Sequence, residues 1–167
     1  MNNKEALFER AYAIIGERTP ITGNCGELCG AGCCKGDEKT GMRLFPGEEA
    51  ALDMTSYETT DGTAICSGRC ERENRPLACR IFPFLPVFTK GGRITVAPDA
   101  GAYKICPLLQ NIDMLRFNKD FLRSVRKVGR FLSSDPDCRK YLSEISRENE
   151  KLSALIFNNK NKSLIRK

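Results

Sequence analysis

The sequence predicts an α+β fold: a small, irregular, cysteine-rich metal-binding core with short antiparallel strands, an N-terminal helix and a C-terminal helical hairpin. Eight of the nine cysteines lie between Cys25 and Cys106, the apolar runs in the middle of the chain are short, and both ends show helical periodicity. We therefore expect a cysteine-rich domain over residues 1–110, a helical hairpin packed on it over 111–158, and a frayed tail at 159–167.

The N-terminal helix is expected over residues 3–17, with Asn3 as its N-cap. Its apolar residues recur at helical spacing and share one face: Leu7, Ala11, Ile14 and Ile15. The next stretch, residues 21–41, is rich in glycine and cysteine and has too few large apolar side chains to form its own core. We expect its order to depend on bound metal.

The middle of the chain predicts short strands. Extended segments are expected at residues 42–45 and 63–65, and a β-hairpin is expected from 87–89 and 93–96, which flank a glycine-containing turn. Residues 81–86, I-F-P-F-L-P, are expected to form neither a helix nor a central strand, because two prolines remove backbone donors. We expect this segment to be a rigid apolar lid.

The first helix of the C-terminal hairpin is expected over residues 112–132, with apolar side chains at i+3 and i+4 steps: Met114, Phe117, Phe121, Val125, Val128 and Leu132. The second helix is expected to open at Asp135-Pro136, because aspartate at the N-cap followed by proline is a favoured start. Its apolar stripe is expected to comprise Tyr141, Leu142, Ile145, Leu152 and Leu155.

Clustered cysteines in a chain without histidine favour a metal centre built from sulfur, since thiolates are soft ligands suited to Zn²⁺ or iron–sulfur clusters. A disulfide framework is the competing interpretation. The N-terminus lacks the apolar stretch and cleavage site of a signal peptide, so we expect a cytoplasmic protein, and no run approaches the ~20 apolar residues of a membrane span. In a reducing compartment such cysteines more often bind metal.

Eight cysteines are candidate metal ligands: Cys25, Cys29, Cys33, Cys34, Cys66, Cys70, Cys79 and Cys106. Two C-x3-C pairs, which begin at Cys25 and Cys66, have loop-type spacing that lets one segment supply two ligands to zinc. The adjacent Cys33 and Cys34 would point in opposite directions in an extended segment, which favours two centres or one multinuclear centre. Iron–sulfur ligation needs the same thiolates and is the alternative, although no C-x2-C-x2-C run is present.

Other residues have a predicted role near these ligands. Cys138 lies on the apolar stripe of the last helix, so we expect it in the core. Arg75 and Arg80 are candidate second-shell residues, because guanidinium groups can donate hydrogen bonds to thiolates; an ordinary surface pair is the alternative. Glu48 and Glu49 are candidates for an oxygen ligand or general base, but a solvated turn is favoured.

The formal net charge of +6 lies in the C-terminal third of the chain. A nucleic-acid-binding module that uses the basic C-terminal helices is therefore a second alternative function. Solvated helix faces, on which long basic side chains cover apolar surface, are the favoured interpretation.

The motifs C-x3-C-x3-C-C, C-x3-C, R-P-L-A-C-R at 75–80 and Cys106-Pro107 resemble the YkgJ-type cysteine-cluster family, described as a zinc- or iron-chelating domain. The resemblance covers about residues 21–110 and includes L-F-P-G-E at 44–48, but each spacer of the first cluster is one residue longer than the family's usual C-x2-C-x2-C-C. It implies metal chelation by the eight cysteines. It leaves open whether a reaction is catalysed and which protein, if any, is the partner.

Overall fold

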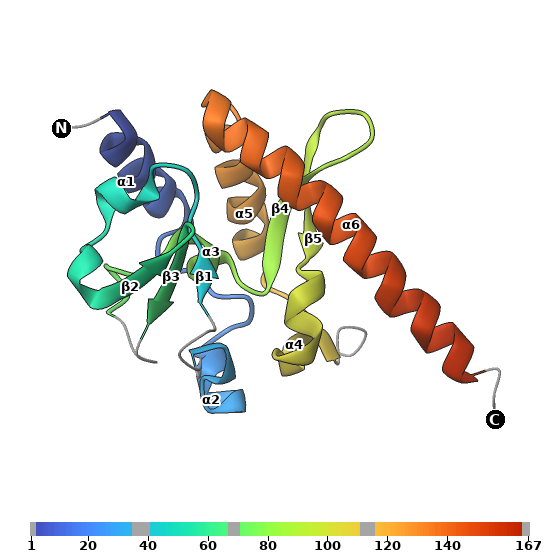
Figure 1. Ribbon diagram of the computed structural model, residues 1–167. Helices are drawn as coiled ribbons and strands as arrows, with labels where there is room; N and C mark the ends of the chain where they lie inside the picture. The colour runs from blue at the N-terminus through green and yellow to red at the C-terminus, as the bar shows by residue number, and fades with distance from the viewer. Residues whose placement is uncertain (1–2, 35–40, 67–70, 111–115, 165–167) are drawn as a thin grey trace.

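The computed structural model describes residues 3–34, 41–66, 71–110 and 116–164, with side chains through Ile156 apart from that of Cys66 (Figure 1). The α-helices are α1 (Asn3–Ile15), α2 (Cys25–Cys29), α3 (Leu77–Ile81), α4 (Pro107–Gln110), α5 (Lys119–Leu132) and α6 (Pro136–Leu164). Short 3-10 helices are η1 (Gly32–Cys34), η2 (Glu48–Ala51), η3 (Met54–Ser56) and η4 (Ala100–Lys104). The strands are β1 (Met42–Arg43), β2 (Tyr57–Thr60), β3 (Thr63–Cys66), β4 (Phe84–Phe88) and β5 (Ile94–Pro98). This mixture of helices and antiparallel strands confirms the α+β class.

The first sheet has the strand order β1-β3-β2 and is antiparallel throughout. Its β1 and β3 confirm the predicted extended segments. Strand β2 was not predicted, because residues 58–60 are exposed and lack apolar alternation. The turn between β2 and β3 contains Asp61 and Gly62 with φ of 48° and 72°. This left-handed backbone is what an Asp-Gly hairpin turn requires.

The β4–β5 hairpin forms the second sheet and confirms the predicted turn, with Val87 opposite Thr95. The prediction that residues 81–86 form neither a helix nor a central strand is wrong at Ile81, which is the last residue of α3. It holds for β4, which begins at Phe84 and includes Pro86 opposite Val96 but is not a central strand. Every strand of a two-stranded sheet is an edge strand, so a proline without an N–H is tolerated there.

One cluster of buried apolar residues joins α1, α3, α4, α5, α6 and β4, and so contains residues from both sides of position 110. Its fully buried members include Phe8, Phe45, Leu77, Leu109, Phe121, Leu132 and Leu142. The predicted core position of Cys138 is confirmed, since this side chain is 0% exposed. On α1, Phe8 and Tyr12 join the predicted Ala11 and Ile15 on the buried face.

The two long helices hold the β4–β5 hairpin. Helix α5 starts at Lys119, later than predicted, because the Asn118 side chain caps it by accepting hydrogen bonds from the N–H groups of Asp120 and Phe121 (2.9 and 3.3 Å). Its Gly129 lies directly against Pro86, where a Cβ atom would collide. Helix α6 covers the edge of β4, since the Phe88 N–H donates to Ser146 Oγ (2.9 Å). The predicted Met114 lies outside the described residues.

Helix α6 begins as predicted, with the Asp135 carboxylate accepting from the Cys138 N–H (3.0 Å). It continues to Leu164, so it extends past residue 158 into the segment predicted to be frayed. Its C-terminal part projects from the rest of the chain (Figure 1). There the predicted stripe is wrong, because Leu152 and Leu155 are 48% and 60% exposed.

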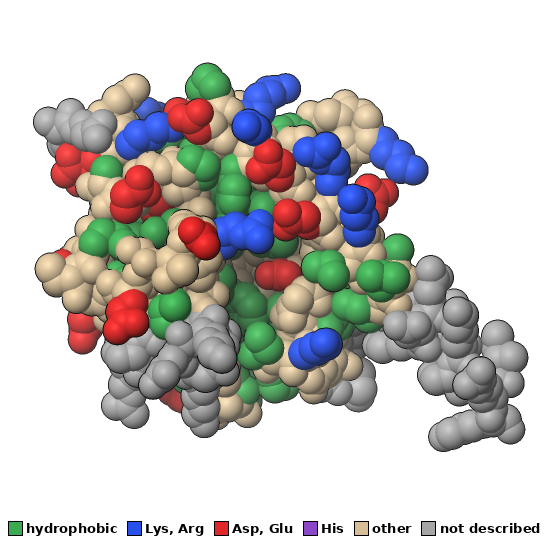
Figure 2. All heavy atoms as spheres, in the orientation of Figure 1, with side chains coloured by type: hydrophobic (Ala, Val, Ile, Leu, Met, Phe, Trp, Pro, Cys, Tyr) green, Lys and Arg blue, Asp and Glu red, His purple; other side chains and the backbone are tan. Residues whose placement is uncertain are grey.

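The described charged side chains on the face in Figure 2 are mixed in sign, with acidic and basic groups interspersed over the body. Within the described part of the chain, no helix combines the length and apolar character that crossing a bilayer requires.

Candidate metal centre

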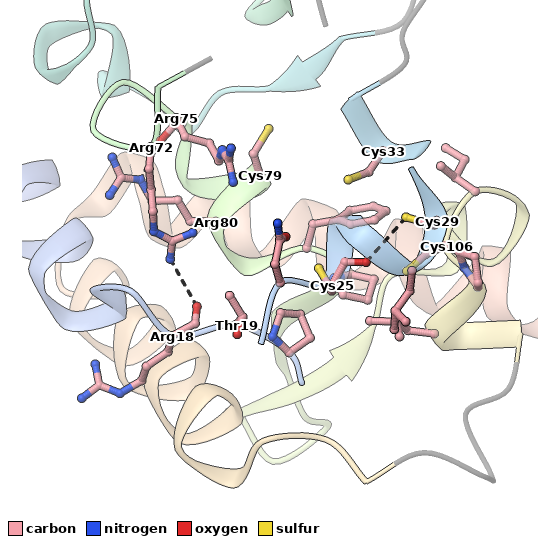
Figure 3. A pocket seen from close by; sticks show the side chains of 18 residues that line it. Arg18, Thr19, Cys25, Cys29, Cys33, Arg72, Arg75, Cys79, Arg80 and Cys106 are labelled. Carbon is pink, nitrogen blue, oxygen red and sulfur yellow. Dashed lines mark hydrogen bonds between the residues drawn. The ribbon is translucent and has the colours of Figure 1, made fainter. Parts of the chain in front are cut away.

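A cavity of about 110 Å³ lies where α2, η1, α3 and the start of α4 meet (Figure 3). Five of the predicted ligands line it: Cys25, Cys29, Cys33, Cys79 and Cys106. They come from four separate segments of the chain. The fold therefore brings together sulfur atoms that are widely separated in the sequence.

Helix α2 presents the first two of these cysteines. The Asn24 side chain caps its N-terminus by accepting from the Gly26 N–H (3.0 Å), and Gly30 ends it with a φ of 57°. The prediction of a loop-type spacing for Cys25 and Cys29 is therefore wrong, because the two residues lie one turn apart in a helix. Residues at i and i+4 share one face of a helix, so both thiols reach the same cavity.

The adjacent pair Cys33 and Cys34 lies in the 3-10 helix η1, not in an extended segment as predicted. Successive side chains of a 3-10 helix are about 120° apart, so the two thiols still diverge. Only Cys33 reaches the first cavity, whereas both line a second cavity of about 250 Å³. Cys79 also lines both cavities, and Asp99 lies in the wall of the second.

The surroundings of three of these thiols, those of Cys25, Cys33 and Cys106, oppose ionisation in the metal-free chain. Desolvation, and then the neighbouring Cys106 and Cys29, raise the pKa of Cys25. Desolvation followed by the adjacent Cys34 thiol raises the pKa of Cys33 to about 12, and desolvation also raises the pKa of Cys106. A bound cation reverses this effect, because coordination stabilises thiolates.

The two arginines predicted near the ligands both line the first cavity, but they differ in their contacts. Arg80 is 8% exposed and donates to the carbonyl oxygens of Arg75 and Glu73, both at 2.7 Å. It thereby holds the segment that leads into α3. Arg75 lines the first cavity close to Cys79, and its charge acts to lower the pKa of Cys25 against the larger effects that raise it (Figure 3).

Two further arginines at the cavity were not predicted from the sequence. Arg18 and Arg72 line the same cavity, and Arg72 forms an ion pair with Glu17 (2.6 Å) and donates to the Gly16 carbonyl (2.8 Å). Arg72 follows the second cysteine pair closely in the sequence, which was the available signal. Arg18 gave none, because its segment reads as the end of a helix.

Glu48 contradicts the predicted solvated turn, because its carboxylate is fully buried, whereas Glu49 is exposed. Desolvation raises the pKa of Glu48, against the opposing effect of hydrogen bonds from Leu77, Phe45 and Tyr12. No sequence signal reveals this, since two of its three partners lie far away along the chain.

Within the described residues, none of the cysteines forms a disulfide, and no three or more cysteine or acidic side chains are arranged closely enough to hold a metal ion. Cys66 ends β3 opposite Tyr57, which lines the second cavity. The side chain of Cys66, and Cys70 as a whole, lie outside the described part of the structure.

Comparison of the chain with protein-family models, with curated proteins and with solved structures finds no match. The resemblance to the YkgJ-type family therefore stays a prediction.

Proposed function

We propose that this chain is a metal-binding protein that chelates zinc through the cysteines of the first cavity. The supporting observation is the convergence of Cys25, Cys29, Cys33, Cys79 and Cys106, from four segments, on one cavity. Their soft sulfur donors suit Zn²⁺, and the chain has no histidine to replace them.

The packing around α2 and η1 supports a metal, because neither element contains a buried residue. Leu28, the large apolar side chain of α2, is 67% exposed. Apolar burial therefore contributes little to holding this segment in place. Coordination to sulfur from α3 and from Cys106 would supply the missing cross-links, since the binding energy of structural zinc acts directly as folding energy.

Sulfur donors of this kind fit zinc, although the described sulfur atoms do not lie close enough together to coordinate one ion. Loading would draw the thiols of α2, η1, α3 and Cys106 together. Cys34 lines only the second cavity, so we assign it to a second centre or to the other side of a shared one. Cys66 and Cys70 are the remaining donors that the sequence offers for completing such a set.

An iron–sulfur cluster is the alternative occupant. Four thiolates can bind either a zinc ion or such a cluster, and this cavity offers five. Anaerobic purification followed by elemental analysis and absorbance spectroscopy separates the two. Zinc gives stoichiometric, colourless protein, whereas a cluster gives a brown protein whose charge-transfer absorbance bleaches on reduction. Wild-type protein that holds neither metal and contains disulfides among these cysteines would refute the proposal.

The decisive variant is Cys79→Ser, with Cys138→Ser as its matched control. Cys79 lines the cavity, whereas Cys138 is buried in the apolar core. We expect Cys79→Ser to lose most of its metal and Cys138→Ser to keep it, even if Cys138→Ser unfolds at lower temperature. Equal metal loss in both folded variants would mean that the cavity is not the binding site.

A further inference from the structure

Glu48 is a fully buried carboxylate, and its hydrogen bonds join three separate parts of the chain. Oε1 accepts from the Tyr12 hydroxyl of α1 (2.8 Å) and from the Leu77 N–H of α3 (2.5 Å). Oε2 accepts from the Phe45 N–H (2.9 Å), which closes the L-F-P-G-E turn on itself. A buried carboxylate is costly unless it is hydrogen-bonded in this way.

The bond to Leu77 fixes the start of the helix that bears Cys79. Leu77 is the first residue of α3 and follows Pro76, which has no N–H. Because the first N–H groups of a helix have no partner within it, an outside acceptor is needed there. The Pro76 side chain provides no cap, so the Glu48 carboxylate serves as the acceptor from outside the helix.

A second contact fixes the other end of α3. The Arg80 guanidinium lies over the ring of Tyr12, 4.1 Å from its centroid, and the Tyr12 hydroxyl is one of the three donors to Glu48. Arg80 also holds the carbonyl oxygens of residues 73 and 75. Glu48, Tyr12 and Arg80 thus brace the short helix on both sides of Cys79.

We infer that Glu48 is a positioning residue for the cysteine cavity, which holds α3 so that the Cys79 thiol stays in the wall shared by both cavities. Cys79 and Cys33 are the two cysteines that line both cavities among the described residues, so a shift of α3 disturbs both. The metal-binding part of this inference rests on the proposed function. The positioning part does not, because it concerns the metal-free chain.

The test compares Glu48→Gln with the neighbouring Glu49→Gln, which changes an exposed side chain. Glutamine keeps the size of Glu48, but its NH₂ group cannot accept a hydrogen bond. One or more of the three donors therefore loses its acceptor. We expect zinc affinity, measured by competition with a chelator, to fall about 10- to 100-fold in Glu48→Gln and to stay unchanged in Glu49→Gln.

A second readout separates positioning from general stability. In reduced, metal-free protein, the alkylation rate of each cysteine is followed by mass spectrometry. We expect Glu48→Gln to speed alkylation of Cys79 severalfold relative to Cys106 of the same sample. An equal change at both cysteines, or no change at either, would overturn the inference.

If Glu48→Gln does not fold, Tyr12→Phe serves as the second variant, since it removes one of the three donors and keeps the ring beneath Arg80. A smaller selective rise at Cys79 is expected, because Glu48 Oε1 loses the hydroxyl that helps to hold it at the Leu77 N–H, and the absence of any rise would overturn the inference. A wild-type protein without metal would contradict the proposed function alone, because the alkylation ratio needs no metal.

Discussion

Helices α5 and α2 are held in place by different means. Helix α5 buries six residues against α1, β4 and β5: Phe121, Ser124, Val125, Val128, Gly129 and Leu132. Helix α2 buries none, and its cysteines line a cavity. Apolar packing is thus sufficient to explain the position of α5. The position of α2 depends on short-range capping and, by our proposal, on coordination.

This contrast predicts that the two regions respond differently to loss of an apolar side chain. Phe121 is 0% exposed, so Phe121→Ala should lower the free energy of unfolding by about 3–5 kcal/mol. Leu28→Ala in α2 should leave it unchanged, because Leu28 is 67% exposed. Chemical denaturation measures both. A similar loss in the two variants would show that α2 belongs to the packed body.

The regular elements of the body were largely predictable from the sequence, because their apolar periodicity is local. The errors have specific physical causes. The strand β2 was missed since Tyr57 is its one buried residue, and Pro86 concealed the first half of β4. The start of α5 was placed too early because Asn118, a strong capping residue, follows the apolar Phe117.

The cysteines of the candidate site were predictable, whereas the groups that position them were not. A cysteine cluster can be recognised from the sequence alone. Its C-x3-C spacing is also that of one helical turn, as found in α2. The burial of Glu48 depends on Tyr12 and Leu77, which approach it only when the chain is folded. Sequence patterns record periodicity along one element, but not contacts between distant elements.

An ion pair between Lys4 and Asp135 attaches α1 to the start of α6. Lys4 Nζ lies 2.7 Å from Asp135, the residue that caps α6, and the side chains are 24% and 17% exposed. Partial burial would raise the pKa of Asp135, but hydrogen bonds from Lys4 and Cys138 outweigh it and lower the pKa below 3.8. The stabilisation is therefore fully present above pH 3.8 and is lost as the pH falls through the lower, folded-state value.

We expect Asp135→Asn, which keeps the cap but removes the charge, to destabilise the chain by about 1 kcal/mol at pH 7. The difference from wild type should vanish in strong acid, where Asp135 is protonated in both the folded and unfolded states. The matched control is Asp120→Asn, because the ion pair of Asp120 with Arg123 is solvent-exposed, with both side chains about two-thirds exposed. A difference that persists unchanged in acid would mean that the charge is not its source.

The smallest effect on global stability is expected at the cap of α2. Asn24→Ala removes the acceptor for the Gly26 N–H, whereas Asn24→Ser keeps a capping oxygen. Because α2 buries no side chain, neither variant should change the denaturation midpoint of the body. Zinc affinity should fall about fivefold in Asn24→Ala alone. Without its cap, α2 is less stable by about 1 kcal/mol, and metal binding by Cys25 and Cys29 must supply that free energy to form the helix. If Asn24→Ala instead lowered the midpoint and left zinc affinity intact, α2 would be a packed element like α5, and the difference between the two regions would disappear.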